Sequence, residues 1–102
     1  MSVPAATASE FQHLALSRVE CVLRDANVSF TSTERRVRGV LFVVKFSVNG
    51  LEHEIDIGED NAAMTSGKSL RECFLASEFR SPRTLADSFS DRLRRYVSGE
   101  EW

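Results

Sequence analysis

The sequence predicts a small α+β domain in two layers, with helices packed on one face of an antiparallel sheet. Two stretches with helical periodicity, one near each end of the chain, flank a central stretch in which apolar and polar residues alternate. The apolar side of the strands supplies the surface that both helices need to cover. With 102 residues the chain has room for one such domain, expected over 9–99.

Residues 1–8 and 100–102 are expected to be tails outside this domain, the first of them disordered. Ser9 can cap the first helix, predicted over 9–26, and Asn27 can end it. The apolar residues of this helix gather on one side at about 100° per residue, and they are Phe11, Ala15, Val19, Val22, Leu23 and Ala26. The opposite side is polar and is expected to face solvent.

The middle of the chain predicts a three-stranded antiparallel meander. A short strand over 28–32 is followed by a polar turn at 33–36, and the next strand spans 36–48. Asn49-Gly50 is the strongest short signal for a two-residue hairpin, because both central residues of a type I′ turn need positive φ. The third strand, over 51–57, alternates apolar and polar residues after that turn.

A two-residue turn determines the register of this hairpin. On the apolar face the expected pairs are Val48–Leu51, Phe46–His53, Val44–Ile55 and Phe42–Ile57. On the other face Lys45 stands opposite Glu54 and Ser47 opposite Glu52. A slip by one residue would destroy both patterns, so the register is strongly specified.

The last third of the chain is predicted to be helical after a loop over 58–68. A short helix is expected over 69–79, because residues recur there at helical spacing, namely Leu70, Cys73, Phe74 and Ser77. Ser81 as a cap and Pro82 at the first helical position predict the start of a longer helix that ends before Gly99. Its apolar stripe consists of Leu85, Phe89, Leu93, Tyr96 and Val97.

Composition and motifs argue against an enzyme, a cofactor and a metal site. The net charge is −2, and the sequence has neither a Gly-rich phosphate loop nor a Gly-x-Ser-x-Gly nucleophile motif. Cys21 and Cys73 do not make a disulfide framework, and each lies in an apolar pattern typical of a free core thiol. Without a signal peptide or a long apolar stretch, the chain is expected to be cytoplasmic and not membrane-bound.

The residues that an enzyme would need have simpler structural interpretations. His13 lies on the solvated side of the first helix. His53 alternates with core residues, but it lies close to the hairpin turn, where the rim of a sheet lets an imidazole reach water. A row of carboxylates about 7 Å apart is expected on the solvated face of the third strand, formed by Glu52, Glu54 and Asp56.

One feature departs from an ordinary solvated face. Val37, Leu41 and Val43 lie on the side of the middle strand that the helices should not cover, where polar residues are normally found. An apolar centre with a charged rim, to which Lys45 and Glu54 contribute, is typical of an interface. Alternatively, the loop over 58–68 or the N-terminal tail folds over this face. The preferred hypothesis is a non-enzymatic domain that binds a protein partner, or a second copy, through this face.

The alternative hypothesis is weak nucleic-acid binding through the arginine-rich segment 80–95. Its candidate phosphate contacts are Arg83, Arg92, Arg94 and Arg95. Asp91 argues against it, because it precedes Arg94 by three residues and Arg95 by four, the spacings of ion pairs within a helix. A nucleic acid is therefore the less favoured partner.

Overall fold

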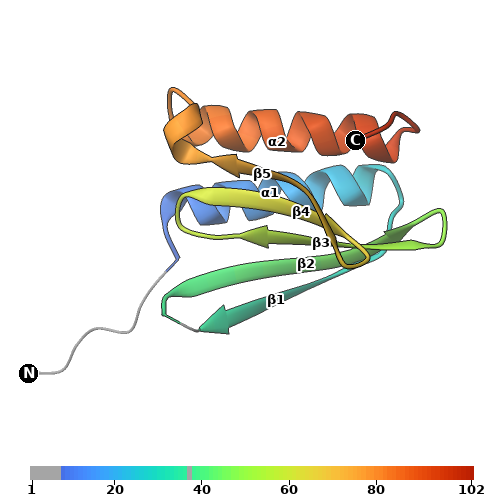
Figure 1. Cartoon of the computed structure of the whole chain (residues 1–102), viewed down its shortest axis with the longest axis horizontal. Coiled ribbons are helices and arrows are strands. Elements are labelled where there is room, and N and C mark those ends of the chain that lie inside the picture. Colours follow the sequence, from blue (N-terminus) through green and yellow to red (C-terminus); the bar gives the residue numbers. More distant parts are fainter. Residues whose placement is uncertain (1–7, 37) are drawn as a thin grey trace, which may run out of the picture.

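The computed structural model describes residues 8–36 and 38–102, so most of the expected N-terminal tail and the interface candidate Val37 lie outside the described residues. Along the chain, five strands lie between two helices, α1 (Glu10–Asp25) and α2 (Pro82–Val97). The strands are β1 (Phe30–Arg36), β2 (Val40–Val48), β3 (Leu51–Ile57), β4 (Asn61–Ser66) and β5 (Ser69–Leu75), and a 3-10 turn, η1 (Ala76–Glu78), follows them. Figure 1 shows both helices on one side of the sheet, which confirms the α+β class.

The sheet is a simple antiparallel meander in which every strand pairs with its neighbours in the chain, in the order β1-β2-β3-β4-β5. The predicted three-stranded sheet was therefore too small. The expected loop over 58–68 contains β4, and the expected short helix over 69–79 is β5 followed by η1. These two strands extend the sheet beyond β3 and bring it to α2.

The hairpin of β2 and β3 has the predicted register. Phe42, Val44, Phe46 and Val48 face Ile57, Ile55, His53 and Leu51, and the pairs Lys45–Glu54 and Ser47–Glu52 lie on the other face. The turn residues Asn49 and Gly50 have φ of 53° and 81°, the two positive values that a type I′ turn requires. The turn chemistry and the alternation of apolar residues thus agree on one register.

The edge strand β1 runs further than predicted, through the polar segment at 33–36 that was expected to turn. Phe30 is half-buried, and the six residues after it are exposed. An edge strand that stays largely exposed gains little from an apolar side, so its sequence need not alternate. The reversal into β2 instead uses Arg38 and Gly39, whose φ angles are 60° and 121°.

The helices cover one face of the sheet, and the core lies between the two layers. Its most deeply buried large side chains come from both helices and from β2, β3 and β4, and include Val19, Leu23, Val44, Ile55, Ile57, Met64, Leu85, Phe89 and Leu93. Gln12 is also fully buried; its Nε2 donates to the carbonyl oxygens of Val40, at 2.6 Å, and Ile57, at 3.2 Å. Since Gln12 also completes a capping box with Ser9, one amide joins the start of α1 to two strands.

Candidate functional site

The face of the sheet turned away from the helices is the surface to which the predicted interface belongs. We call it the open face. The strand registers place on it Thr31, Thr33, Arg35, Leu41, Val43, Lys45, Ser47, Glu52, Glu54, Asp56, Asn61, Ala63, Thr65, Leu70, Cys73 and Leu75. Neither α1 nor α2 lies over these residues (Figure 1). The segment 58–68, which was one candidate to cover them, widens the face instead by forming β4.

The two described apolar residues of the predicted interface share the open face but differ in exposure. Leu41 is half-buried, whereas Val43 is only 1% exposed. Val43 lies between Thr33 of β1 and Asp56 of β3, its partners across the two ladders. Of this pair, Leu41 therefore offers the contact area.

Sequence reasoning missed a second apolar part of the open face, on β5. Leu70 is 64% exposed and Leu75 is 43% exposed, two of the three large hydrophobic residues that stand out in solvent within the described part of the chain. They were missed because β5 was read as a helix. The available signal was an alternation along β5, with Cys73 and Leu75 on one face and the half-buried Phe74 on the other. A register shift between Met64 and Thr65 in the pairing of β4 with β5 interrupts this alternation.

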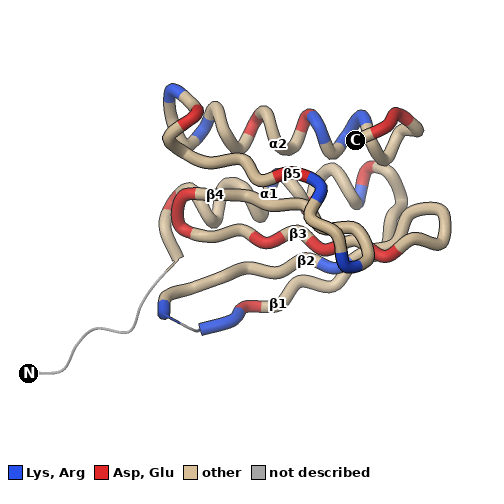
Figure 2. Tube along the Cα trace, viewed as in Figure 1, with Lys and Arg blue, Asp and Glu red and all other residues tan. Residues whose placement is uncertain are grey.

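The acidic row on β3 separates these two apolar parts, and Figure 2 shows acidic residues recurring along that strand. Glu54 Oε1 lies 3.9 Å from Lys45 Nζ on β2, as the register predicts. Burial raises the pKa of Asp56 to about 6, and a hydrogen bond with Glu54 and the charge of Glu54 act in the same direction. Asp56 Oδ1 is buried and has no hydrogen-bond partner among the described residues. The open face thus holds a carboxyl group poorly stabilised as an anion.

Asp56→Asn is expected to raise the free energy of unfolding by about 1 kcal/mol near pH 7.5. A raised pKa means that the folded chain keeps a proton that the unfolded chain has already lost. The stabilisation is present at low pH and is lost as the pH rises from about 4 to about 6. The expected gain is limited to about 1 kcal/mol because Asp56 is only half-buried, so that solvent partly screens the charges.

Urea unfolding of wild type and Asp56→Asn at about pH 4.5 and about pH 7.5 checks this prediction. The gain should appear at the higher pH and shrink at the lower one. Glu52→Gln, in the same row but exposed, is the control and should change stability little at either pH. A loss of stability in Asp56→Asn near pH 7.5 would contradict the expectation.

His53 belongs to a buried polar cluster that joins β3, β4 and α2. Its Nδ1 lies 2.8 Å from Ser66 Oγ, and its Nε2 lies 2.9 Å from the Tyr96 hydroxyl. The ring stacks on Phe46 at 5.1 Å between centroids and meets the Tyr96 ring edge-on at 5.2 Å. The prediction of a rim histidine in contact with water was wrong: His53 is 3% exposed, because β4 and the end of α2 enclose it.

The pKa of His53 is lowered, chiefly by burial and secondarily by the charge of Arg71, so the ring is neutral at pH 7. Ser66 is 7% exposed, and both ring nitrogens of His53 already have a hydroxyl partner. A nucleophilic serine needs an accessible hydroxyl, and its base is usually oriented by a third group at the other nitrogen. Here that nitrogen meets a tyrosine of the helix layer. The cluster is therefore arranged to hold α2 against the sheet.

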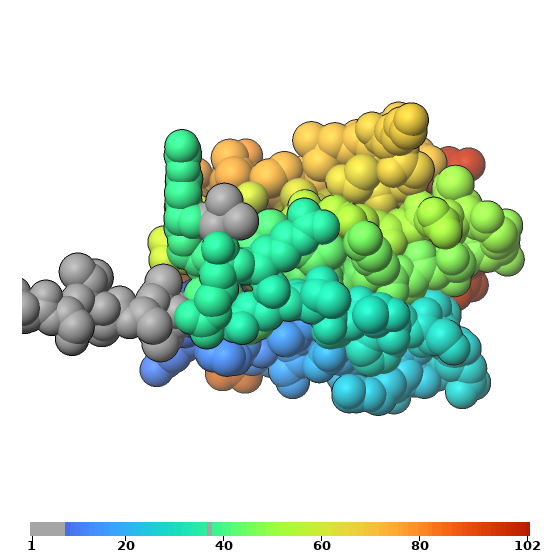
Figure 3. Space-filling model, turned by 90° about the horizontal axis from the view of Figure 1, so that it is seen from below, coloured from blue at the N-terminus to red at the C-terminus, as the bar shows by residue number. Residues whose placement is uncertain are grey.

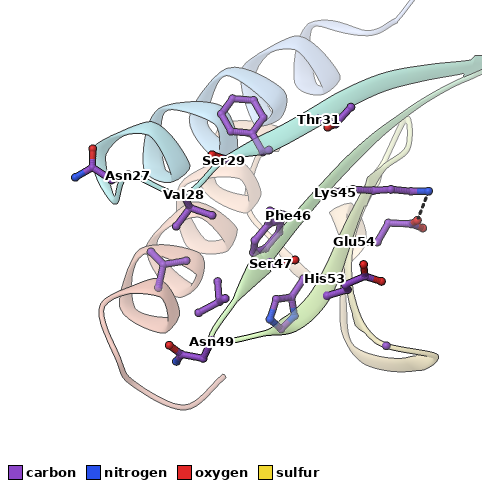
Figure 4. Close-up of a pocket in the computed structure, with 15 residues that line it drawn as sticks. Asn27, Val28, Ser29, Thr31, Lys45, Phe46, Ser47, Asn49, His53 and Glu54 are labelled. Carbon is purple, nitrogen blue, oxygen red and sulfur yellow. Dashed lines mark ion pairs between the residues drawn. The ribbon is translucent and has the colours of Figure 1, made fainter.

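A wide depression of about 910 Å³ lies at the end of the sheet where β1 begins and the hairpin of β2 and β3 turns. Figure 4 shows Val28 on one side of it, Phe46 towards its centre and the Lys45–Glu54 ion pair at one margin. His53 also borders it, but both ring nitrogens are engaged. Specific small-molecule sites are mostly apolar clefts in which a few polar groups converge on the ligand. Here the charged residues Lys45 and Glu54 pair with each other at the margin instead.

The predicted nucleic-acid contacts on α2 do not form one patch. Arg94 and Arg95 contact Asp91 at 3.5 and 3.3 Å, and Arg92 lies 3.8 Å from Glu72 Oε1. Figure 2 shows the resulting alternation of basic and acidic residues along the helix. Arg83 is in the first turn, about 14 Å along the axis from Arg92 at 1.5 Å per residue.

The remaining residues of chemical interest lie apart from one another. Cys21 and Cys73 are both free thiols; Cys21 is exposed, not in the core as expected, and Cys73 is half-buried. Among the described residues no group of three His, Cys, Asp or Glu side chains is placed to hold a metal ion, and no helix is long and apolar enough to cross a membrane. No family model matches the chain, and no curated protein or solved structure is significantly similar to it.

Proposed function

We propose that this protein is a non-enzymatic binding domain that contacts another protein through the open face of its sheet. The observation that carries the proposal is the combination of exposed leucines on β5, Leu70 and Leu75, with the half-buried Leu41 on β2. Exposed apolar side chains gathered on one face are typical of protein interfaces. On this face the acidic row lies between them, so a partner has to match charge as well as apolar surface.

The acidic row favours a basic partner. Asp56 has a buried oxygen without a hydrogen bond, and the neighbouring Glu54 helps to raise its pKa. A lysine or arginine brought beside Glu54 and Asp56 would offset the repulsion between the two carboxyl groups. The partner surface therefore combines apolar side chains, which meet the leucines, with at least one cation that meets the acidic row.

The nucleic-acid alternative receives less support. The open face presents carboxylates, which repel phosphate, and Arg92, Arg94 and Arg95 are each within 4 Å of an acidic side chain. No described observation favours the enzyme hypothesis over a structural role for His53, since its nitrogens bond to side chains of the fold.

Selection from a random peptide library on the wild-type protein tests the proposal. The recovered peptides should be rich in lysine or arginine interspersed with apolar residues. Leu75→Thr should weaken their binding at least about tenfold, which corresponds to about 1.4 kcal/mol. Leu51→Thr is the matched control, because Leu51 is 41% exposed against 43% for Leu75 but lies outside the open face.

The same peptides should also bind Asp56→Asn more weakly than wild type, because the substitution removes the anion that the cation would meet. Calorimetric titration of wild type and the three variants measures each affinity. Peptides that are acidic, or that bind Leu75→Thr as tightly as wild type, would overturn the proposal. Binding lost equally in Leu51→Thr would point to a general loss of folding instead of the open face, and would also count against it.

A further inference from the structure

We propose that two copies of this chain pair through their β1 strands, antiparallel and centred on Thr33, to form one continuous sheet of ten strands. The pairing uses the edge of the sheet, a surface separate from the open face. It can therefore succeed or fail independently of the proposed function.

Within residues 8–36 and 38–102, no strand pairs with the outer edge of β1. β1 is the first strand of the sheet, and its residues 31–36 are all exposed. Figure 3 looks towards this edge and shows β1 along the near side of the molecule, with α1 on one side of it and β4 and β5 on the other. The opposite edge differs, because β5 leads into η1 and contacts α2. An open edge presents unpaired backbone groups to another strand.

The register identifies which backbone groups of β1 point outward. In a two-residue hairpin the residues flanking the turn, here Val48 and Leu51, form a hydrogen-bonded pair, and such pairs alternate along the ladder. The backbone N–H and C=O groups of residues 41, 43 and 45 of β2 therefore point towards β1. They form hydrogen-bonded pairs with residues 35, 33 and 31. The bond from Gly67 N to the Glu52 carbonyl oxygen agrees with this alternation on the far side of β3.

The residues of β1 with outward backbone groups are consequently Phe30, Ser32, Glu34 and Arg36. Two antiparallel copies centred on Thr33 bring these residues opposite one another: Phe30 faces the partner's Arg36, and Ser32 faces the partner's Glu34. Each of these pairs can exchange two backbone hydrogen bonds. The centre on Thr33 is the arrangement in which all seven residues of β1 find a partner.

The charges on β1 permit this register and oppose those shifted towards the C-terminal end of the strand. With the centre on Thr33, no charged residue lies directly opposite a like charge, and Arg35 faces the partner's Thr31. A centre on Glu34 would place two carboxylates opposite each other, and a centre on Arg35 would do the same with two guanidinium groups. Like charges directly opposite each other destabilise a sheet. Charged edge residues usually discourage pairing. Here they disfavour the centres on Glu34 and Arg35, and Thr33 is favoured over Ser32 because a centre on Ser32 would pair only five residues of β1.

This pairing has a two-fold axis perpendicular to the sheet, the commonest symmetry for small assemblies. Both open faces then lie on the same side of the joined sheet, and the two β2 strands with Leu41 are each one strand away from the axis. The dimer would present a continuous face of double width. The use of that face to bind a partner rests on the proposed function, but the pairing itself does not.

A disulfide at the axis tests the register. In a background with Cys21→Ser and Cys73→Ser, the substitution Thr33→Cys puts two thiols at a pair without backbone hydrogen bonds. The Cβ atoms of such a pair are about 4.5–5.5 Å apart, close to what a disulfide needs. Mild oxidation should give a covalent dimer on a non-reducing gel. Thr31→Cys is the matched control, exposed and on the same face, but about 13 Å from its own copy by strand geometry.

We expect Thr33→Cys to cross-link at least about tenfold faster than Thr31→Cys. Equal rates for the two variants, or no cross-link in either, would overturn the pairing. Disulfide exchange depends on thiolate fraction and access, so the two neighbouring threonine positions are compared at one pH.

Sedimentation equilibrium of the unmodified chain gives a second, independent readout. Ser32→Pro removes an outward N–H without touching the β1–β2 ladder, and should weaken the dimer at least about tenfold. Ser32→Ala keeps the N–H and should leave the dimer unchanged, although it loses the bond from Ser32 Oγ to Glu20. A monomeric wild type would overturn the pairing and leave the peptide-binding test of the proposed function intact. A dimer broken by Leu75→Thr and not by Ser32→Pro would mean that copies meet through the open face.

Discussion

Replacing Phe89 by alanine is expected to lower the free energy of unfolding by about 3–5 kcal/mol, the range for a fully buried phenylalanine. Phe89 is 1% exposed and lies at the centre of an aromatic cluster. Its ring meets Phe74 edge-on at 5.3 Å and Trp102 at 5.6 Å. The alanine variant would lose these contacts and leave a cavity between α2 and β5, which the packed layers can fill only in part.

Urea unfolding of wild type and variant measures the change. Phe79→Ala is the control, because Phe79 stacks on the same Phe74 ring at 5.6 Å but is only half-buried, and it should cost less. Trp102 is the only tryptophan in the chain, so a red shift of its emission in Phe89→Ala would report the opened cluster directly. A loss smaller than that of Phe79→Ala would show that α2 is not packed on the sheet through Phe89.

The parts of the fold that the sequence predicts correctly are those where two independent signals agree. For the β2–β3 hairpin, the Asn49-Gly50 turn and the alternation of apolar residues specify the same register, and the structure has it. For α2, Ser81 and Pro82 mark the start, and the apolar stripe gives the buried side. For α1, the cap at Ser9 was predicted, although the tertiary role of Gln12 was not.

The β4–β5 hairpin was missed because its signals conflict. Ala62 and Ala63 are weak indicators of a strand, because alanine is depleted in strands. The period of two along β4 is visible in the burial of its residues and not in their amino-acid types. On β5 the register shift near Met64 and Thr65 breaks the period of two and leaves residues spaced as in a helix. Gly67, with φ of 60°, was the one turn residue that marked the reversal.

The same error determined how much of the candidate site could be predicted. The open face, Leu41 and the Lys45–Glu54 pair follow from the β2–β3 register alone and are found as expected. Leu75 on that face and the burial of His53 both depend on strands beyond β3. No reasoning about a three-stranded sheet could place Ser66 beside His53, since Ser66 was assigned to a loop.

Replacing His53 by alanine is expected to lower the free energy of unfolding by about 3 kcal/mol. The cost has two sources: a cavity between Phe46 and Tyr96, and the loss of the hydrogen-bond partner of two hydroxyl groups, one of them on the buried Ser66. His13→Ala is the matched control, because His13 is exposed, and its effect should stay within about 0.5 kcal/mol. Urea unfolding of both variants near pH 7.5 compares them.

The pH dependence tests separately whether His53 is buried as a neutral ring. The lowered pKa means that the unfolded chain takes up a proton near pH 6.5 while folded His53 stays neutral until a lower pH. Wild-type stability should therefore fall as the pH drops below about 6.5, and His53→Ala should lose this slope. Asp56 produces the opposite slope between about pH 4 and about pH 6, so the comparison is best made in the Asp56→Asn background. A slope near pH 6 that survives in the double variant would show that His53 is not the titrating group.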